Sequence, residues 1–372
     1  MNQRGISLGR ILGIPIRLDY SWFLIFALVA WTLAVGYFPA EFRNRPVVEY
    51  WVVGVVAAIM FFASVVLHEL GHSVVATRNK IPVSSINLFV FGGVSQIETE
   101  PSSAKVEFLM AIVGPLVSFA LAGIFGLLQL AFAPFAPLLA MAKYLTYINA
   151  ALGVFNLIPG FPLDGGRVFR SIVWGATHNL PRATTIAGNL GRFIGFLLVL
   201  FGVYQVIGGN LINGLWIGFI GWFLESAAAS QVQQQRIQDL LAGRTVSQAM
   251  TCKYVAIPPD ITVQQLVDTH ILGSGQRSFV VEEGGRVAGL LTMHSIRQTP
   301  RSEWPTTPAA QVMIPLAFVK WTRPEAELWT AMERMNRDGV NQLPVMTDGQ
   351  ILGMLCREDI ITYLHNLREL GL

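Results

Sequence analysis

The residues with the clearest capacity for chemistry are His-Glu-Leu-Gly-His at positions 68–72, at the end of a long apolar run. Residues four apart share a face of a helix, so His68 and His72 can offer two imidazoles to one metal ion, with Glu69 close to its water. This spacing is typical of zinc peptidases. The alternative is two buried polar histidines, but ionisable groups at membrane depth are costly and usually functional.

A second polar segment covers residues 156–167 and contains two prolines and three glycines. Such a segment ends or breaks a membrane helix, and broken helices are tolerated mainly where they are packed in protein or line a watery cavity. Asp164 is thereby presented on irregular backbone. A catalytic zinc takes three protein ligands and leaves the fourth position for water, so Asp164 is predicted to join His68 and His72 around one Zn²⁺ per chain. The alternative is an ordinary turn aspartate.

Membrane helices must position these residues, because 53% hydrophobic residues, 13% charged residues and a mean hydropathy of +0.51 exceed the values of soluble domains. We expect a multi-span α-helical membrane protein with a small membrane-embedded β-segment, followed by a soluble α/β half. Half of the 26 lysines and arginines fall after residue 230, in the shorter part of the chain. About 20 apolar residues make one span, and six spans are predicted at 19–39, 50–77, 105–130, 143–161, 189–208 and 211–230.

Charge and cysteine content indicate the compartment of the protein and limit the kinds of partner that it can bind. Most lysines and arginines of the membrane half fall on the side of the N-terminus, so the positive-inside rule predicts a cell-membrane protein with a cytoplasmic N-terminus and soluble half. No cleavable signal is expected before the first apolar run. Two cysteines, Cys252 and Cys356, suit a reducing compartment. A net charge of +3 without a basic cluster argues against nucleic acid.

The two polar segments together resemble the site-2 protease family of intramembrane zinc metalloproteases. The family pattern joins His-Glu-x-x-His in one span to a later Asn-x-x-Pro-x-x-x-x-Asp-Gly stretch, and the resemblance covers residues 1–230. It implies zinc ligation by His68, His72 and Asp164. It also implies that Glu69 is the general base and that Asn156 assists the substrate carbonyl or its oxyanion.

Residues 86–97 are too short to span a membrane, are rich in strand formers, and are interrupted by Gly92 and Gly93. We predict a membrane-embedded β-segment. In the family that the chain resembles, such a segment lies beside the zinc, where glycines let a substrate backbone approach closely. The alternative is a purely structural hairpin. In the third span, Ser118 stands where many members of that family have asparagine.

The soluble half contains an internal repeat, in which residues 246–250 recur as 309–313 and residues 279–291 as 343–355. It resembles a tandem pair of cystathionine-β-synthase-type (CBS) domains. A helical linker is predicted at 231–243, the first domain at 244–302 and the second at 303–372. The resemblance implies an adenine nucleotide (ATP, ADP or AMP) near Thr292 or Asp359, and homo-oligomers. The ribose-binding pattern of such domains, a Ser or Thr three residues before an Asp, is incomplete in both copies. The first has Thr292 but Ser295 in the Asp place, and the second has Asp359 but Cys356 in the Thr place. A purely structural dimerising module stays an open alternative.

These observations predict hydrolysis of peptide bonds within or near transmembrane segments of membrane proteins, in contact with membrane lipid and modulated through the CBS pair. A substrate helix must first unwind, because its peptide bonds are hydrogen-bonded internally. Two alternatives are a CBS-gated transporter or channel and a catalytically silent scaffold. The concentration of polar residues in two spans, with a complete set of ligands and base, favours the peptidase.

Overall fold

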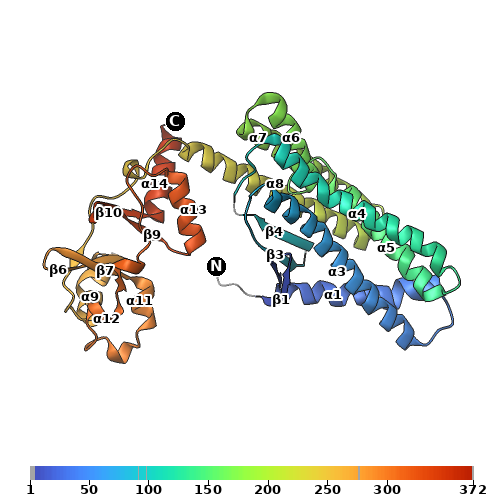
Figure 1. Cartoon of the computed structure of the whole chain (residues 1–372), viewed down its shortest axis with the longest axis horizontal. Coiled ribbons are helices and arrows are strands. Elements are labelled where there is room, and N and C mark those ends of the chain that lie inside the picture. The colour runs from blue at the N-terminus through green and yellow to red at the C-terminus, as the bar shows by residue number, and fades with distance from the viewer. Residues whose placement is uncertain (1–4, 91, 98, 275–276, 371–372) are drawn as a thin grey trace. The chain divides into compact units, whose positions relative to one another are not determined.

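The computed structural model describes residues 5–90, 92–97, 99–274 and 277–370, which form two compact units that divide between Gln235 and Arg236 (Figure 1). The first unit contains the long apolar helices and one small sheet. The second contains two short sheets with helices around them.

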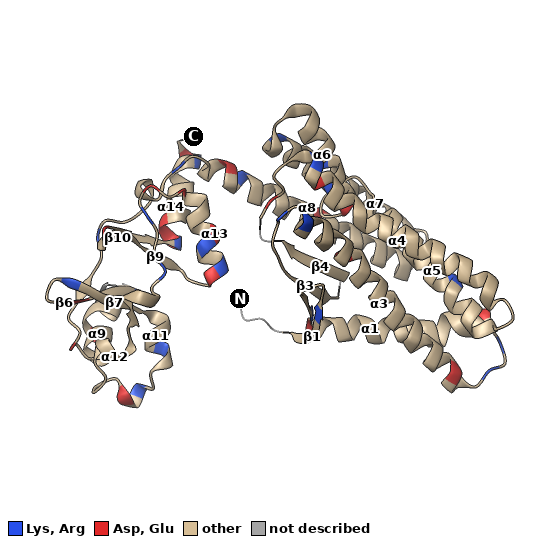
Figure 2. Ribbon diagram, viewed as in Figure 1, with Lys and Arg blue, Asp and Glu red and all other residues tan. Residues whose placement is uncertain are grey.

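Six helices of the described residues are long and apolar enough to cross a membrane, which confirms the predicted number of spans. The first consists of α1 (Tyr20–Thr32), a π-helical turn (Leu33–Tyr37) and α2 (Phe38–Glu41). The others are α3 (Val47–Arg78), α4 (Ala104–Phe132), α5 (Ala136–Asn156), α7 (Leu180–Ile207) and α8 (Leu211–Leu241). Charged residues are sparse along the middle of these helices (Figure 2).

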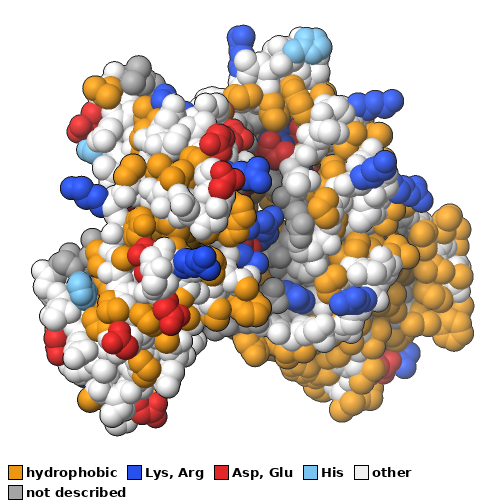
Figure 3. All heavy atoms as spheres, turned by 60° about the vertical axis from the view of Figure 1, so that its left-hand side comes forward, with side chains coloured by type: hydrophobic (Ala, Val, Ile, Leu, Met, Phe, Trp, Pro, Cys, Tyr) orange, Lys and Arg blue, Asp and Glu red, His pale blue; other side chains and the backbone are white. Residues whose placement is uncertain are grey.

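Apolar side chains cover much of the visible surface of the helical unit (Figure 3). Leu130 and Ile207, for example, are 78% and 81% exposed. A soluble protein rarely exposes apolar patches of this extent, whereas a lipid-facing helix requires them. The helix faces that are buried inside the unit carry many small residues, which let the helices approach closely.

The fourth and fifth spans begin earlier than expected. The fourth begins at Ala136 and ends at Asn156, ahead of Pro159 and Gly160. The fifth begins at Leu180, where Asn179 caps the helix by accepting a hydrogen bond from the Arg182 N–H. Between them lies the amphipathic helix α6 (Asp164–Thr177), which hydropathy alone did not indicate.

The small sheet has the strand order β1-β2-β3-β4, with β1 (Ile6–Ile11), β2 (Ile14–Leu18), β3 (Val83–Phe89) and β4 (Gly92–Ile97). The predicted β-segment is the antiparallel pair of β3 and β4; Phe91, between them, lies outside the described residues. The N-terminal hairpin of β1 and β2 was not expected, and β2 joins β3 in parallel. Within the sheet β4 is an edge strand.

The second unit has the architecture expected of a CBS pair. One sheet contains β5 (Ala256–Ile257), β6 (Ser278–Glu283), β7 (Arg286–Thr292) and β8 (Ile314–Pro315), and the other contains β9 (Gln342–Thr347) and β10 (Gln350–Cys356). The helices are α9 (Val263–Leu266), α10 (Leu272–Ser274), α11 (Met293–Gln298), α12 (Ala309–Val312), α13 (Leu328–Asp338) and α14 (Arg357–Glu369). Both hairpins, β6–β7 and β9–β10, close in tight turns, where Gly284, Gly285, Asp348 and Gly349 have positive φ angles.

Candidate metal centre and active site

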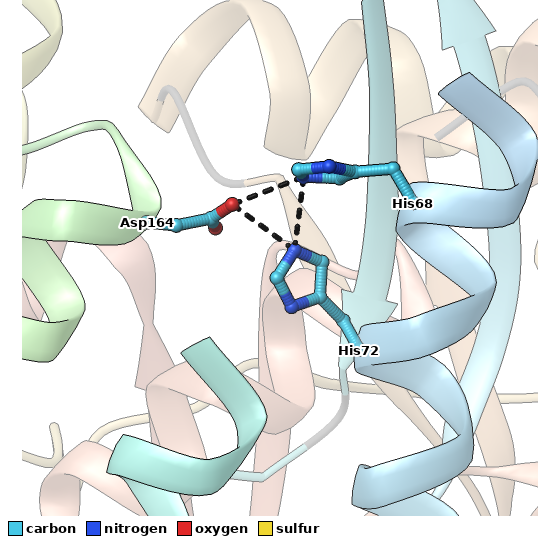
Figure 4. Close-up of side chains that lie close together, drawn as sticks. All are labelled: His68, His72 and Asp164. Carbon is cyan, nitrogen blue, oxygen red and sulfur yellow. Dashed lines mark hydrogen bonds and ion pairs between the residues drawn. The ribbon is translucent and has the colours of Figure 1, made fainter. Parts of the chain in front are cut away.

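His68, His72 and Asp164 converge on one point of the membrane unit (Figure 4). The two histidines lie one turn apart on α3, and Asp164 is the first residue of α6. Asp164 Oδ2 lies 3.0 Å from His68 Nε2 and 3.1 Å from His72 Nε2, and the two Nε2 atoms are 3.2 Å apart. The structure thus brings together the three predicted ligands, from segments far apart in the sequence.

This donor set fits a zinc ion. Bonds of about 2.0–2.2 Å in a tetrahedral arrangement place neighbouring ligand atoms about 3.3 Å apart, close to the separations observed. Two imidazole nitrogens and one carboxylate oxygen are also a common ligand set for catalytic zinc. The side chains of His68 and His72 are buried, and that of Asp164 is 17% exposed, so the point where they meet is largely shielded by protein.

Helix α4 orients both imidazoles from behind. His72 Nδ1 donates to the Met110 carbonyl oxygen at 2.6 Å, and His68 Nδ1 lies 2.9 Å from Ser118 Oγ. Because a carbonyl oxygen can only accept, His72 Nδ1 carries a proton, and Nε2 is the ring nitrogen that faces Asp164. The hydroxyl of Ser118 thus contacts one of the predicted ligands directly.

Gly114 of α4 leaves the space that the two imidazoles fill. A Cβ atom at this position would lie 2.2 Å from His72 Nε2 and 2.7 Å from His68 Nε2. Only glycine permits that approach without displacing a ligand. Sequence reasoning did not assign Gly114 or Met110 to the site. Met110 contributes a backbone oxygen, which leaves no trace in the residue type.

Glu69 is held by the edge strand β4. Its Oε2 accepts hydrogen bonds from the Ser95 N–H at 3.1 Å and from the Ser95 hydroxyl at 2.8 Å. Gly93, also on β4, packs against the same side chain, since a Cβ atom there would lie 2.6 Å from Glu69 Cγ. The strand thus contacts the predicted base directly, and Gly93 must be small for that reason.

The remaining predicted residues of the membrane unit lie at the ends of elements. Asn156 is the last residue of α5 and is half-buried, just before the irregular segment that leads to Asp164. Gly92 begins β4 with a φ of +125°, a conformation that favours glycine.

Thr292 and Asp359 both line one cavity of about 1040 Å³ in the second unit. Each also belongs to a helix N-terminus: Thr292 caps α11, and Asp359 accepts from the Cys356 N–H at 2.7 Å. Asp359 also accepts from the Thr251 hydroxyl at 2.9 Å.

Burial, with Asp359 and Glu358 nearby, raises the pKa of Cys356 to about 12, so its thiol is neutral. The basic residues that line this cavity are Lys253, Arg277, Arg297 and Lys320.

Comparisons with known proteins identify both units. Residues 56–143 and 129–202 match the model of peptidase family M50, and residues 246–301 and 310–366 match that of the CBS domain. The chain is 34% identical over 360 residues to Rip3 of Mycobacterium tuberculosis, described as a candidate zinc metalloprotease, covering 95% of this chain and 91% of that protein. The chain belongs to the site-2 zinc metalloprotease family. The predicted family, enzyme class and CBS pair are thereby confirmed.

The chain is also similar to two other proteins. The zinc metalloprotease MJ0392 of Methanocaldococcus jannaschii is 30% identical over 297 residues, covering 79% of each chain. The solved site-2 protease from the same organism is 29% identical, with a TM-score of 0.42, and covers 61% of this chain and 95% of that one. Family membership favours the peptidase over a CBS-gated transporter or channel and over a silent scaffold.

Proposed function

We propose that this chain holds one Zn²⁺ between His68, His72 and Asp164 and hydrolyses peptide bonds within or near transmembrane segments of other membrane proteins. The observation that carries the proposal is the convergence of three ligand atoms at about 3 Å from one another, with the outer nitrogen of each imidazole already engaged by α4. Such engagement fixes the ring orientation that a metal ligand needs.

The other residues divide the chemistry. When bound, zinc supplies Lewis acidity that polarises the scissile carbonyl and acidifies water. Glu69 then accepts the proton of the attacking water and returns it to the leaving amine, while Ser95 keeps its carboxylate in one orientation. Asn156 donates its side-chain amide to the developing oxyanion, a contribution of roughly 3 kcal/mol for one such donor elsewhere.

The edge strand β4 is the proposed substrate contact. A transmembrane helix must lose internal hydrogen bonds before its backbone can reach Glu69, and an edge strand offers replacement partners. Gly92 and Gly93 carry no side chains that would keep this backbone away. Substrates with helix-weakening residues near the scissile bond are therefore expected to be cleaved faster.

The proposed setting is the cell membrane, with the N-terminus and the CBS pair in the cytoplasm, as the lysine and arginine distribution favours. The CBS domains, proposed at 244–302 and 303–372, follow a linker at 231–243 and support homo-oligomers. We also propose that their cavity binds an adenine nucleotide, because basic side chains suit phosphates.

One experiment separates metal binding from catalysis. The full chain, purified in detergent, is incubated with a panel of single-span substrates, and metal content is measured on the same samples. Glu69→Gln should keep about one zinc per chain and lose cleavage roughly 10²- to 10⁴-fold, because the base is not a ligand. His68→Ala and Asp164→Ala should lose both.

The control is His365→Ala, since this histidine is exposed and lies in the CBS unit. It should keep zinc and cleavage. Zinc loss in Glu69→Gln, or full activity in Asp164→Ala, would contradict the assigned roles.

A further inference from the structure

One face of α4 carries four residues at helical spacing: Glu107, Met110, Gly114 and Ser118, all buried. Three of them contact the histidines, as described above. The fourth, Glu107, contacts a different helix. It forms an ion pair with Arg170 of α6, the helix whose first residue is Asp164.

The pair is deeply buried and joins several elements. Glu107 is fully buried and Arg170 is 4% exposed. Glu107 Oε1 accepts from Arg170 Nε at 2.6 Å and also from Nη2. Arg170 Nη1 donates to Thr184 Oγ1 of α7 at 3.3 Å, and the guanidinium lies 5.3 Å from the centre of the Phe161 ring, in the segment that precedes Asp164.

Stability alone does not account for such a pair. Removing two charges from solvent is expensive, and well-packed neutral residues of similar volume often give equal or greater stability. A buried, forked guanidinium instead fixes geometry, because its donors point in set directions. Here it fixes α6 against α4, and α4 is the helix that orients both imidazoles.

The Glu107 carboxylate also lies 3.9 Å from Arg167 Nε, in the first turn of α6, so Glu107 contacts this helix at two residues. Leu163, at the N-cap position, makes no side-chain cap, and the last residue of the helix is Thr177. Arg170 lies six residues after Asp164, roughly 9 Å along the helix axis. A small rotation or slide of α6 on α4 would therefore move Asp164 away from the imidazoles.

We infer that Glu107 and Arg170 form a positioning clamp that sets Asp164 at the correct distance from His68 and His72. The inference rests on the proposed zinc site. Neither clamp residue contacts the three ligands directly, so the clamp acts through α4 and α6. Its loss lowers zinc affinity and turnover even where the fold persists.

The test replaces both charges at once, as Glu107→Gln with Arg170→Met, because removing one partner would leave a buried unpaired charge. Four quantities are measured on the full chain in detergent: the melting temperature of the zinc-free protein, the zinc affinity by chelator competition, and kcat and KM on a substrate that the wild type cleaves. We expect a melting temperature near that of the wild type, a zinc affinity lowered roughly 10- to 100-fold, and a lower kcat with little change in KM.

A second variant, Arg170→Lys, keeps the ion pair and removes the fork. It should fold and show a zinc affinity between those of the wild type and the double variant. The matched control is Glu225→Gln with Arg192→Met, which removes the ion pair between α7 and α8 by the same substitutions. That control should keep the zinc affinity of the wild type.

Wild-type zinc affinity and kcat in the clamp double variant would reduce the pair to a structural contact. Equal zinc loss in the clamp and control variants would also overturn the inference. A wild type without zinc or cleavage would instead refute the proposed function, and the clamp with it.

Discussion

At the scale of single residues, the candidate site depends on a glycine without a side chain as much as on functional groups. Gly114 has no side chain, and both imidazoles occupy the space that a Cβ atom would need. Glu69, His68 and His72 could be recognised from their spacing, whereas Gly114 could not, because its contacts come from another helix. The same holds for Met110, which contributes only its carbonyl oxygen.

Gly114→Ala should therefore displace the imidazoles and lower zinc affinity by roughly 10- to 100-fold, with loss of cleavage. The matched control is Gly123→Ala in the same helix, where a Cβ atom would meet nothing within 4 Å. Chelator competition and the cleavage assay measure both variants. Equal zinc affinity in the two alanine variants would show that α3 and α4 can separate at no loss to the site.

At the scale of elements, β4 joins two roles that sequence reasoning kept apart. Residues 86–97 were predicted as a β-segment for substrate contact, and the strand also holds the base through Ser95. Gly93 packs against Glu69. An extended substrate that pairs with this strand would thus lie next to an oriented carboxylate.

Ser95→Ala should lower kcat about tenfold or more without loss of zinc, because a hydrogen bond to a charged group contributes about 1.5–3 kcal/mol. Ser95→Thr retains a hydroxyl and should recover much of the activity. The control is Ser85→Ala on β3, whose hydroxyl contacts Asn87 and Gln96. An unchanged kcat in Ser95→Ala would mean that the backbone N–H alone orients Glu69.

At the scale of the whole molecule, apolar length and charge distribution suffice for six spans and a soluble half, because lipid leaves the backbone few options. The internal repeat, with its Gly-containing turns, is sufficient to predict the CBS pair from the sequence. Helix α6 and the N-terminal hairpin could not be found this way. Helix α6 is short and amphipathic, so it does not stand out as an apolar run. The hairpin of β1 and β2 joins a larger sheet only by pairing with β3, which is distant in the sequence.

The last prediction concerns nucleotide binding by the CBS pair in the full chain. Each carboxylate oxygen of Asp359 already accepts one hydrogen bond, from the Thr251 hydroxyl and from the Cys356 N–H, so only the remaining lone pairs are available to a ribose. At the corresponding place the first repeat has Ser295, which offers no carboxylate. We therefore expect at most one adenine-nucleotide site per chain, of modest affinity.

Calorimetry with ATP, ADP and AMP tests this on the wild type, Asp359→Asn and Thr292→Val. Asparagine keeps an acceptor for the helix cap but removes the charge, so Asp359→Asn should bind about tenfold more weakly, because hydrogen bonds to charged groups are the stronger ones. Thr292 lines the same cavity, so a wild-type affinity in Thr292→Val would place the site at the second repeat, whereas weaker binding would include Thr292 in it. Cleavage with and without nucleotide tests coupling, which can only reflect a difference in nucleotide affinity between two states of the protein. No heat with any nucleotide would leave the pair as a dimerisation or substrate-filtering module, and binding with unchanged cleavage would refute regulation.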